Sequence, residues 1–268
     1  MPRPSLQRFW DLLGSGRALP GPRTTGDPPS ANGASSLHLR WELPPRAAPL
    51  RQVAVTLEVV APPEVDRLYF WALQADFADP SGRPAGGAHL GLQWHPQHPG
   101  STAVNWGGYD ATGRELDGSG SDLPSALRNV NTRDMAWSPG RPYRLVIARH
   151  DDGAGTVWRG SVTGPDGAVT VVRDLYPAAD RIVGVVMWSE VFARCDHPSV
   201  GVRWSDPSAV TLEGDPVAPG RLSVNYQSHA QGGCANTDSR VDGAGVVQWT
   251  NAPRTTPQGA VLAVPDPR

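Results

Sequence analysis

The chain has 268 residues, a formal net charge of −2 and ten tryptophans. A chain of this length can bury a sizeable core without a metal or a disulfide, and it can form one large all-β domain. The chain has no lysine, and its arginines are scattered among acids, which argues against a nucleic-acid partner. No stretch approaches the roughly 20 apolar residues of a membrane span, so no membrane partner is expected.

Residues 1–36 are predicted to form an N-terminal arm or linker, with a short helix over Ser5–Leu13. The rest of the arm is rich in Pro, Gly and Ser and cannot bury enough apolar surface to offset the cost of ordering. The apolar run near Trp10 is shorter than a secretory signal requires, which predicts a cytoplasmic protein. A start at another codon would leave secretion open.

Residues 37–252 are predicted to form one β-sandwich domain, followed by a C-terminal tail over residues 253–268. Short alternating runs separated by Gly, Pro and Asp turns predict two packed antiparallel sheets of the jelly-roll, concanavalin A-like type. We expect Leu90, Leu92 and Trp94 to face the core, together with Val183, Val185 and Met187. The strand-like runs are Leu37–Leu43, Gln52–Val60, Arg67–Phe77, Ala88–His95, Thr102–Trp106, Tyr143–His150, Thr156–Thr163, Ala168–Leu175, Ile182–Val191, Val200–Trp204, Arg221–Gln227 and Gly245–Thr250.

Two segments resemble metal-binding motifs. Asp117–Asp122 resembles the opening of a calcium loop, but an EF-hand needs Gly at its sixth position and a carboxylate at its twelfth, where this chain has Asp122 and Arg128. His95 and His98 lie between prolines, and two ligands do not make a zinc site, so a surface turn is expected. No cofactor is predicted, with a structural calcium ion left open.

The two cysteines, Cys195 and Cys234, are compatible with one disulfide or with two buried thiols. Both follow strand ends next to turns rich in Gly or Pro, so we expect them near one another in either case. A disulfide is typical of a secreted protein and not of the reducing cytosol.

Alternation also predicts a polar face. Side chains two apart in a strand point the same way, so Gln74, Gln93 and Asn105 form a polar row if their strands are neighbours. Trp188 and Glu190 share a face as well. Amides beside indoles suit a saccharide, whose C–H faces stack on rings while its hydroxyls need paired donors and acceptors. The predicted ligand-binding residues are Gln74, Gln93, Asn105 and Glu190, with Trp106, Trp158 and Trp188 as stacking candidates.

Three short motifs carry a family resemblance: Tyr69-Phe70-Trp71-Ala72-Leu73-Gln74, Gly87-Ala88-His89-Leu90-Gly91-Leu92-Gln93 and Val104-Asn105-Trp106-Gly107. They resemble uncharacterised bacterial domains of the concanavalin A-like, lectin or glucanase type. The resemblance implies a sandwich whose concave face binds glycan. The Glu-x-Asp-x-x-Glu signature of laminarinase-type enzymes is absent. Glu64 and Asp66 match its first two acids, but Tyr69 stands at the position of the third.

The leading hypothesis is therefore a carbohydrate-binding sandwich that recognises a glycan or another polar small molecule. The first alternative is a glycoside hydrolase that uses Glu190 as acid/base with Asp76 as its partner. The second is a protein-interaction sandwich. Paired carboxyls would favour the glycosidase, one carboxylate among amides would favour binding, and a flat aromatic patch would favour a partner protein. The sugar and the oligomeric state are left open.

Overall fold

The computed structural model describes residues 22–44, 47, 49–151 and 155–265. The predicted helix over Ser5–Leu13 lies outside these residues. The regular secondary structure of the described chain is almost entirely strand, with short 3-10 turns at Pro99–Ser101 and His229–Gln231. The strands are β1 (Ser35–Glu42), β2 (Leu50–Ala61), β3 (Tyr69–Ala78), β4 (Pro84–Trp94), β5 (Thr102–Tyr109), β6 (Thr132–Asp134), β7 (Pro142–Asp151), β8 (Thr156–Thr163), β9 (Val169–Leu175), β10 (Arg181–Val191), β11 (Gly201–Thr211), β12 (Pro216–Val217), β13 (Arg221–Tyr226), β14 (Thr237–Val241), β15 (Val246–Thr250) and β16 (Val261–Ala263).

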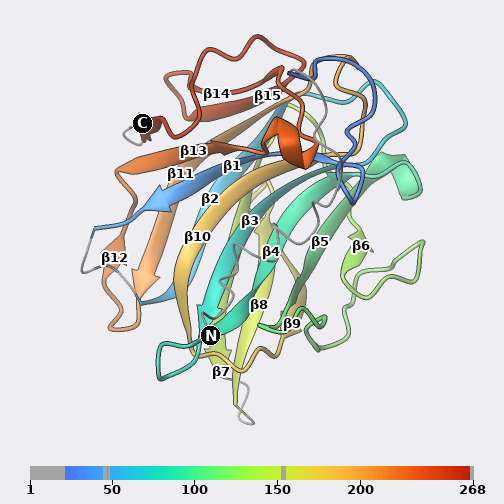
Figure 1. Ribbon diagram of the computed structural model, residues 1–268. Coiled ribbons are helices and arrows are strands. Elements are labelled where there is room, and N and C mark those ends of the chain that lie inside the picture. The colour runs from blue at the N-terminus through green and yellow to red at the C-terminus, as the bar shows by residue number, and fades with distance from the viewer. Residues whose placement is uncertain (1–21, 45–46, 48, 152–154, 266–268) are drawn as a thin grey trace.

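These strands form two antiparallel layers (Figure 1). The first sheet runs β16-β13-β1-β10-β3-β4-β5-β6, and the second runs β14-β15-β11-β2-β7-β8-β9, with β12 paired to β11. The layers join at one residue pair, Ile182 opposite Leu50. The predicted two-sheet antiparallel sandwich is confirmed. Among the described residues, no helix is long and apolar enough to cross a membrane.

The core lies between the two sheets. Leu90, Leu92, Val185 and Met187 are buried there as predicted, and Trp94 packs against the same cluster. Val183 is 47% exposed, so the prediction that it faces the core is wrong. The register of β10 on β3 shifts between residues 182 and 184, so an extra residue turns Val183 outward and the alternation resumes one position later.

The two ends of the described chain are tied to the sandwich. Near the start, the backbone carbonyl of Gly26 accepts a hydrogen bond from the Cys195 N–H at 2.8 Å. Near the end, β16 pairs with β13 inside the segment that the sequence assigns to a tail. Cys195 and Cys234 form a disulfide with a Cα–Cα distance of 5.6 Å, which confirms that the two cysteines are neighbours.

Candidate functional site

The pairing register of the first sheet decides which of the predicted residues share a face. Residues opposite one another, or two apart along a strand, point the same way. Gln74, Gln93, Asn105 and Glu190 all lie on the face turned away from the core, which we call the outer face. Across β10, β3, β4 and β5, its first row is Glu190, Phe70, Gln93 and Ala103, its second is Trp188, Ala72, Gly91 and Asn105, and its third is Val186, Gln74, His89 and Gly107.

Trp106 and Trp158 are not on the outer face. Both are fully buried in the core between the sheets. The Trp106 indole N–H donates to the backbone carbonyl of Trp158 at 3.3 Å, and the Trp158 indole N–H donates to the carbonyl of Ala179 at 3.1 Å. The prediction that these two rings stack on a ligand is wrong. Trp106 follows Asn105 directly, and successive side chains point to opposite faces. Trp158 belongs to β8 of the second sheet and is buried in the core.

Trp188 does lie on the outer face, in a small apolar cluster with Phe70, Ala72 and Val186. Its ring meets Phe70 edge to face, with centroids 4.9 Å apart, and meets His89 with centroids 5.6 Å apart. Only 3% of Trp188 is exposed. This indole is therefore a packed wall of the site and does not offer an open stacking surface.

Both polar groups of the Gln74 side chain form hydrogen bonds within the protein. Its side-chain carbonyl accepts from the Trp188 indole N–H at 3.1 Å, and its amide nitrogen donates to Asp76 at 2.8 Å. The Asp76 carboxylate also faces the guanidinium of Arg40 at 3.8 Å. These contacts make Gln74 a structural brace for Trp188.

Glu190 is the carboxylate of the first row. The amide nitrogen of Asn32 donates to it at 2.8 Å. Burial raises the pKa of Glu190 above its ordinary value, while the bond from Asn32 opposes that rise. The candidate partner Asp76 lies six residues along β3 from Phe70, the residue opposite Glu190. That separation is about 20 Å at roughly 3.3 Å per residue, so Glu190 and Asp76 are not a catalytic pair.

Gln93 and Asn105 sit at the other side of the same face. They are 5% and 7% exposed. The Asn105 amide nitrogen donates to the Thr132 hydroxyl at 2.9 Å. Their side-chain carbonyl oxygens have no hydrogen-bond partner among the described residues. Buried acceptors without partners call for a donor from water or from a ligand.

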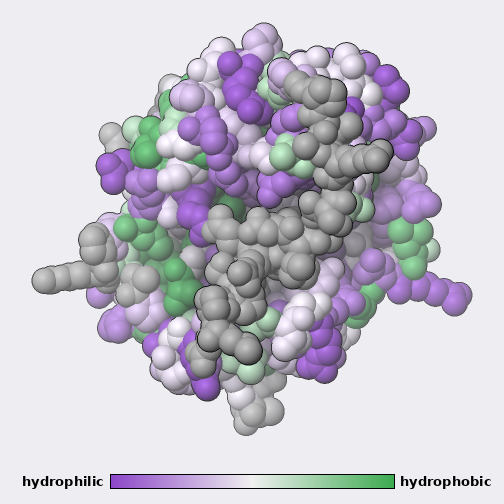
Figure 2. All heavy atoms as spheres, viewed as in Figure 1, coloured by the Kyte–Doolittle hydropathy of each residue, from purple (hydrophilic) through white to green (hydrophobic). Residues whose placement is uncertain are grey.

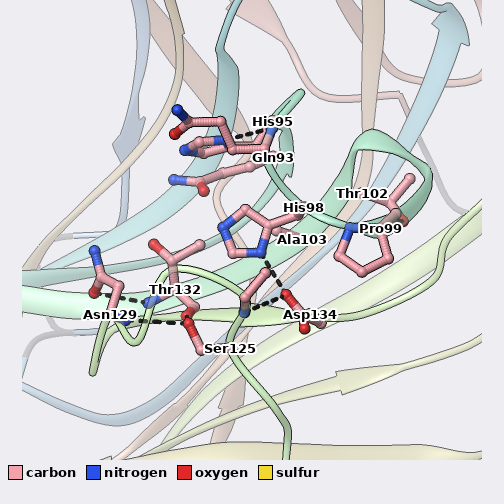
Figure 3. Close-up of polar contacts among 12 residues, drawn as sticks. Gln93, His95, His98, Pro99, Thr102, Ala103, Ser125, Asn129, Thr132 and Asp134 are labelled. Carbon is pink, nitrogen blue, oxygen red and sulfur yellow. Dashed lines mark hydrogen bonds and ion pairs between the residues drawn. The ribbon is translucent and has the colours of Figure 1, made fainter.

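His98 is buried, so the prediction that it lies in a surface turn is wrong for this residue. Its Nδ1 lies 2.5 Å from a carboxylate oxygen of Asp134 (Figure 3). The same oxygen accepts from the Ala126 N–H at 3.1 Å. Burial alone would raise the pKa of Asp134, but these hydrogen bonds hold it below its usual range. Sequence reasoning missed Asp134 because it belongs to the three-residue strand β6.

The two histidines of the outer face, His38 and His89, are held neutral. Burial lowers the pKa of each to about 4. Sequence reasoning did not single them out as functional. Among the described residues, no group of three or more His, Cys, Asp or Glu gathers to hold a metal ion. Within the three rows, the outer face therefore presents neutral polar groups around one carboxyl, Glu190, while Asp76 and Asp134 lie further along the same face.

Hydrophilic and hydrophobic residues are interspersed over the side of the molecule shown in Figure 2, outside the grey atoms. The hydrophobic areas seen there are small and separated from one another. A protein-interaction sandwich would favour a continuous apolar or aromatic surface. This side of the described chain gives that alternative no support.

No protein-family model and no curated protein matches the chain. Among solved structures, it is similar to Scytalido-glutamic peptidase with a peptide-based transition-state analog, with a TM-score of 0.44 and 11% identity over 85% of this chain and 99% of that one. SCP-B, a member of the Eqolisin family of peptidases in complex with the tripeptide Ala-Ile-His, has a TM-score of 0.42 and 11% identity over the same shares. Peanut lectin with a nine-residue peptide has a TM-score of 0.29 and 13% identity over 94% and 91%. The function is therefore inferred from the site.

Proposed function

We propose that the outer face of the first sheet hydrolyses amide bonds of an extended peptide, with Glu190 as acid/base and Gln93 as the donor to the oxyanion. One observation carries this proposal: Glu190 and Gln93 stand in one cross-strand row, on either side of Phe70. Two strand spacings separate their Cα atoms, which is about 10 Å. Two side chains rising from such positions leave room between them for a carbonyl group and one water.

The chemistry requires a single carboxyl group. Glu190 in its carboxylate form takes a proton from the water, whose oxygen bonds to the substrate carbonyl carbon. The developing oxyanion accepts a hydrogen bond from the Gln93 amide nitrogen. As the C–N bond breaks, Glu190 returns the proton to the leaving nitrogen, which regenerates the carboxylate. Burial of Glu190 makes it a stronger base than an exposed glutamate.

Glycoside hydrolysis fits the outer face less well. It ordinarily needs two carboxyl groups, about 5–5.5 Å apart for retention or about 6.5–9.5 Å apart for inversion. The pairing of β3 with β10 places Asp76 much further from Glu190 than either of these spacings. One-carboxylate amide hydrolysis therefore replaces the glycosidase alternative.

The test is a quenched-fluorescent peptide library, incubated with the full chain from acid to neutral pH. We expect turnover in the wild type, none in Glu190→Gln, and a large loss of kcat in Gln93→Ala with a smaller change in KM. The matched control is Glu64→Gln, the same change at an exposed glutamate between β2 and β3. Turnover by Glu190→Gln equal to the wild type would refute the assignment.

The pH profile gives a second readout. The base must be ionised, so kcat/KM is expected to rise with pH through a pKa above the ordinary value for glutamate. Such an enzyme would work in an oxidising compartment, because the bridge between Cys195 and Cys234 does not persist in a reducing cytosol.

Glycan binding is the second candidate. The unpartnered carbonyl oxygens of Gln93 and Asn105 favour it, because sugar hydroxyls are donors that such acceptors can bind. The burial of Trp106 and Trp158 removes most of the stacking surface that this hypothesis requires. A glycan array tests it: Gln93→Ala should weaken binding with a nearly unchanged melting temperature. An array on which the wild type binds nothing removes this candidate.

A further inference from the structure

Three residues near Ala103 each carry a buried polar atom without a hydrogen-bond partner among the described residues: Gln93 Oε1, Asn105 Oδ1 and His98 Nε2. Gln93 lies opposite Ala103 on β4, and Asn105 follows two residues later on β5, on the same face. Asp134 lies opposite Ala103 on the other side and holds His98 by Nδ1. Figure 3 shows the His98 ring beside Ala103. We call this group the Ala103 niche.

The niche is buried and has a defined polarity. Ala103, whose side chain is a single methyl group, is 0% exposed. When His98 donates from Nδ1 to the Asp134 carboxylate, its Nε2 carries a lone pair and becomes an acceptor. Arg133, the neighbour of Asp134, lies opposite Val104 and therefore points to the other face. With His98 in this form, the niche offers three neutral acceptors with one carboxylate behind them.

We propose that the Ala103 niche binds the primary ammonium group at the amino terminus of a substrate peptide, an inference that rests on the proposed hydrolase function. A primary ammonium carries three N–H donors and no acceptor, which matches three acceptors. Its positive charge faces Asp134. A single water has only two donors and would leave one buried acceptor unmet.

The position of the niche sets the length of the product. The ammonium group lies over Ala103 and the scissile carbonyl over Phe70, two strand spacings away in the same row. That is about 10 Å, and an extended chain advances about 3.3 Å per residue. The bond after the third residue therefore reaches Glu190.

The test compares peptides of one sequence with a free or an acetylated amino terminus, with the products identified by mass spectrometry. The wild-type chain is expected to release amino-terminal tripeptides. Acetylation should lower kcat/KM by about tenfold or more, the effect of losing hydrogen bonds to a charged group. Asn105→Leu should bring the ratio of free to acetylated rates toward one, and Asn105→Asp should widen it. Glu64→Gln, at an exposed residue, should keep the wild-type ratio.

The outcomes separate this inference from the function on which it rests. Asn105→Leu also loses the bond to Thr132, so a melting curve accompanies each variant. Equal rates on free and acetylated peptides, or cleavage at no fixed distance from the amino terminus, overturn the niche and leave the hydrolase standing. If no peptide is cleaved, the hydrolase fails, and methylammonium is titrated while the imidazole NMR signals of His98 are followed. A shift in the wild type that is absent in Asn105→Leu supports the niche, and no shift means that it holds only water.

Discussion

Replacing Trp106 with alanine tests whether this ring belongs to the core or to a ligand site. Trp106 is fully buried, and its indole N–H bonds to the carbonyl of Trp158. Truncating a buried Trp to Ala costs about 3–5 kcal/mol. In a domain of this size, that corresponds to a fall in melting temperature of roughly 6–20 °C. Urea unfolding should show a lower midpoint with an unchanged slope. A stable Trp106→Ala variant that has lost only ligand binding would refute the core assignment.

A second substitution makes the test sharper. A Cβ added at Gly160 on β8 would lie 2.6 Å from the Trp106 Cγ, a contact that the rigid ring cannot relieve. Gly160→Ala alone is therefore expected to destabilise the protein, whereas in the Trp106→Ala background the new methyl group enters vacated space. The double-mutant cycle should give a favourable coupling energy of about 1 kcal/mol or more. Additive effects would mean that the two residues do not pack on each other.

Three further predictions concern single features. Replacing Cys195 and Cys234 with Ser should lower the free energy of unfolding by about 4 kcal/mol in the chain-entropy model, and a urea midpoint equal to the wild type would mean that no bridge forms. Because the folded-state pKa of Glu190 is raised, the stability it contributes is full below its ordinary value and is lost as the pH rises through the raised pKa. Glu190→Gln should thus raise the urea midpoint at neutral pH and leave it unchanged near about pH 3. Val183→Asp should change stability by less than about 0.5 kcal/mol, whereas Val185→Asp should cost several kcal/mol, and equal effects would place both side chains on one face.

Alternation along the strands is enough to predict which residues share a face in much of the candidate site. It places Gln74, Gln93 and Glu190 on one face once β10, β3 and β4 are neighbours, which their order and register make them. The same rule forbids Asn105 and Trp106 from sharing a face, since they are consecutive in one strand. The signal that Trp106 belongs to the core was therefore present in the sequence.

Other features depend on tertiary contacts that no local pattern contains. Val183 turns outward because of a bulge at one position of the pairing between β10 and β3. His98 and Asp134 are 36 residues apart, and Asp134 reaches the histidine only because β6 adds three residues to the edge of β5. The bond from Asn32 to Glu190 spans 158 residues. Such contacts follow from how distant segments pack, which the spacing of residue types does not encode.

A sheet offers its side chains only at discrete separations, and this restricts the chemistry of the outer face. Neighbouring positions lie about 4.8 Å apart across strands and about 6.7 Å apart along one strand. The spacings of a glycosidase pair therefore require a carboxyl next to Glu190, either directly or diagonally, since a diagonal neighbour lies about 8 Å away. The direct neighbours are Ser36 on β1, Phe70 on β3 and Trp188 on β10, and the diagonal neighbours are His38 on β1 and Ala72 on β3. None of these five is an acid, whereas the amide of Gln93 stands one strand beyond Phe70. The proposed hydrolysis at Glu190 therefore relies on one carboxyl and one amide, and peptide amide hydrolysis is the assay that tests it.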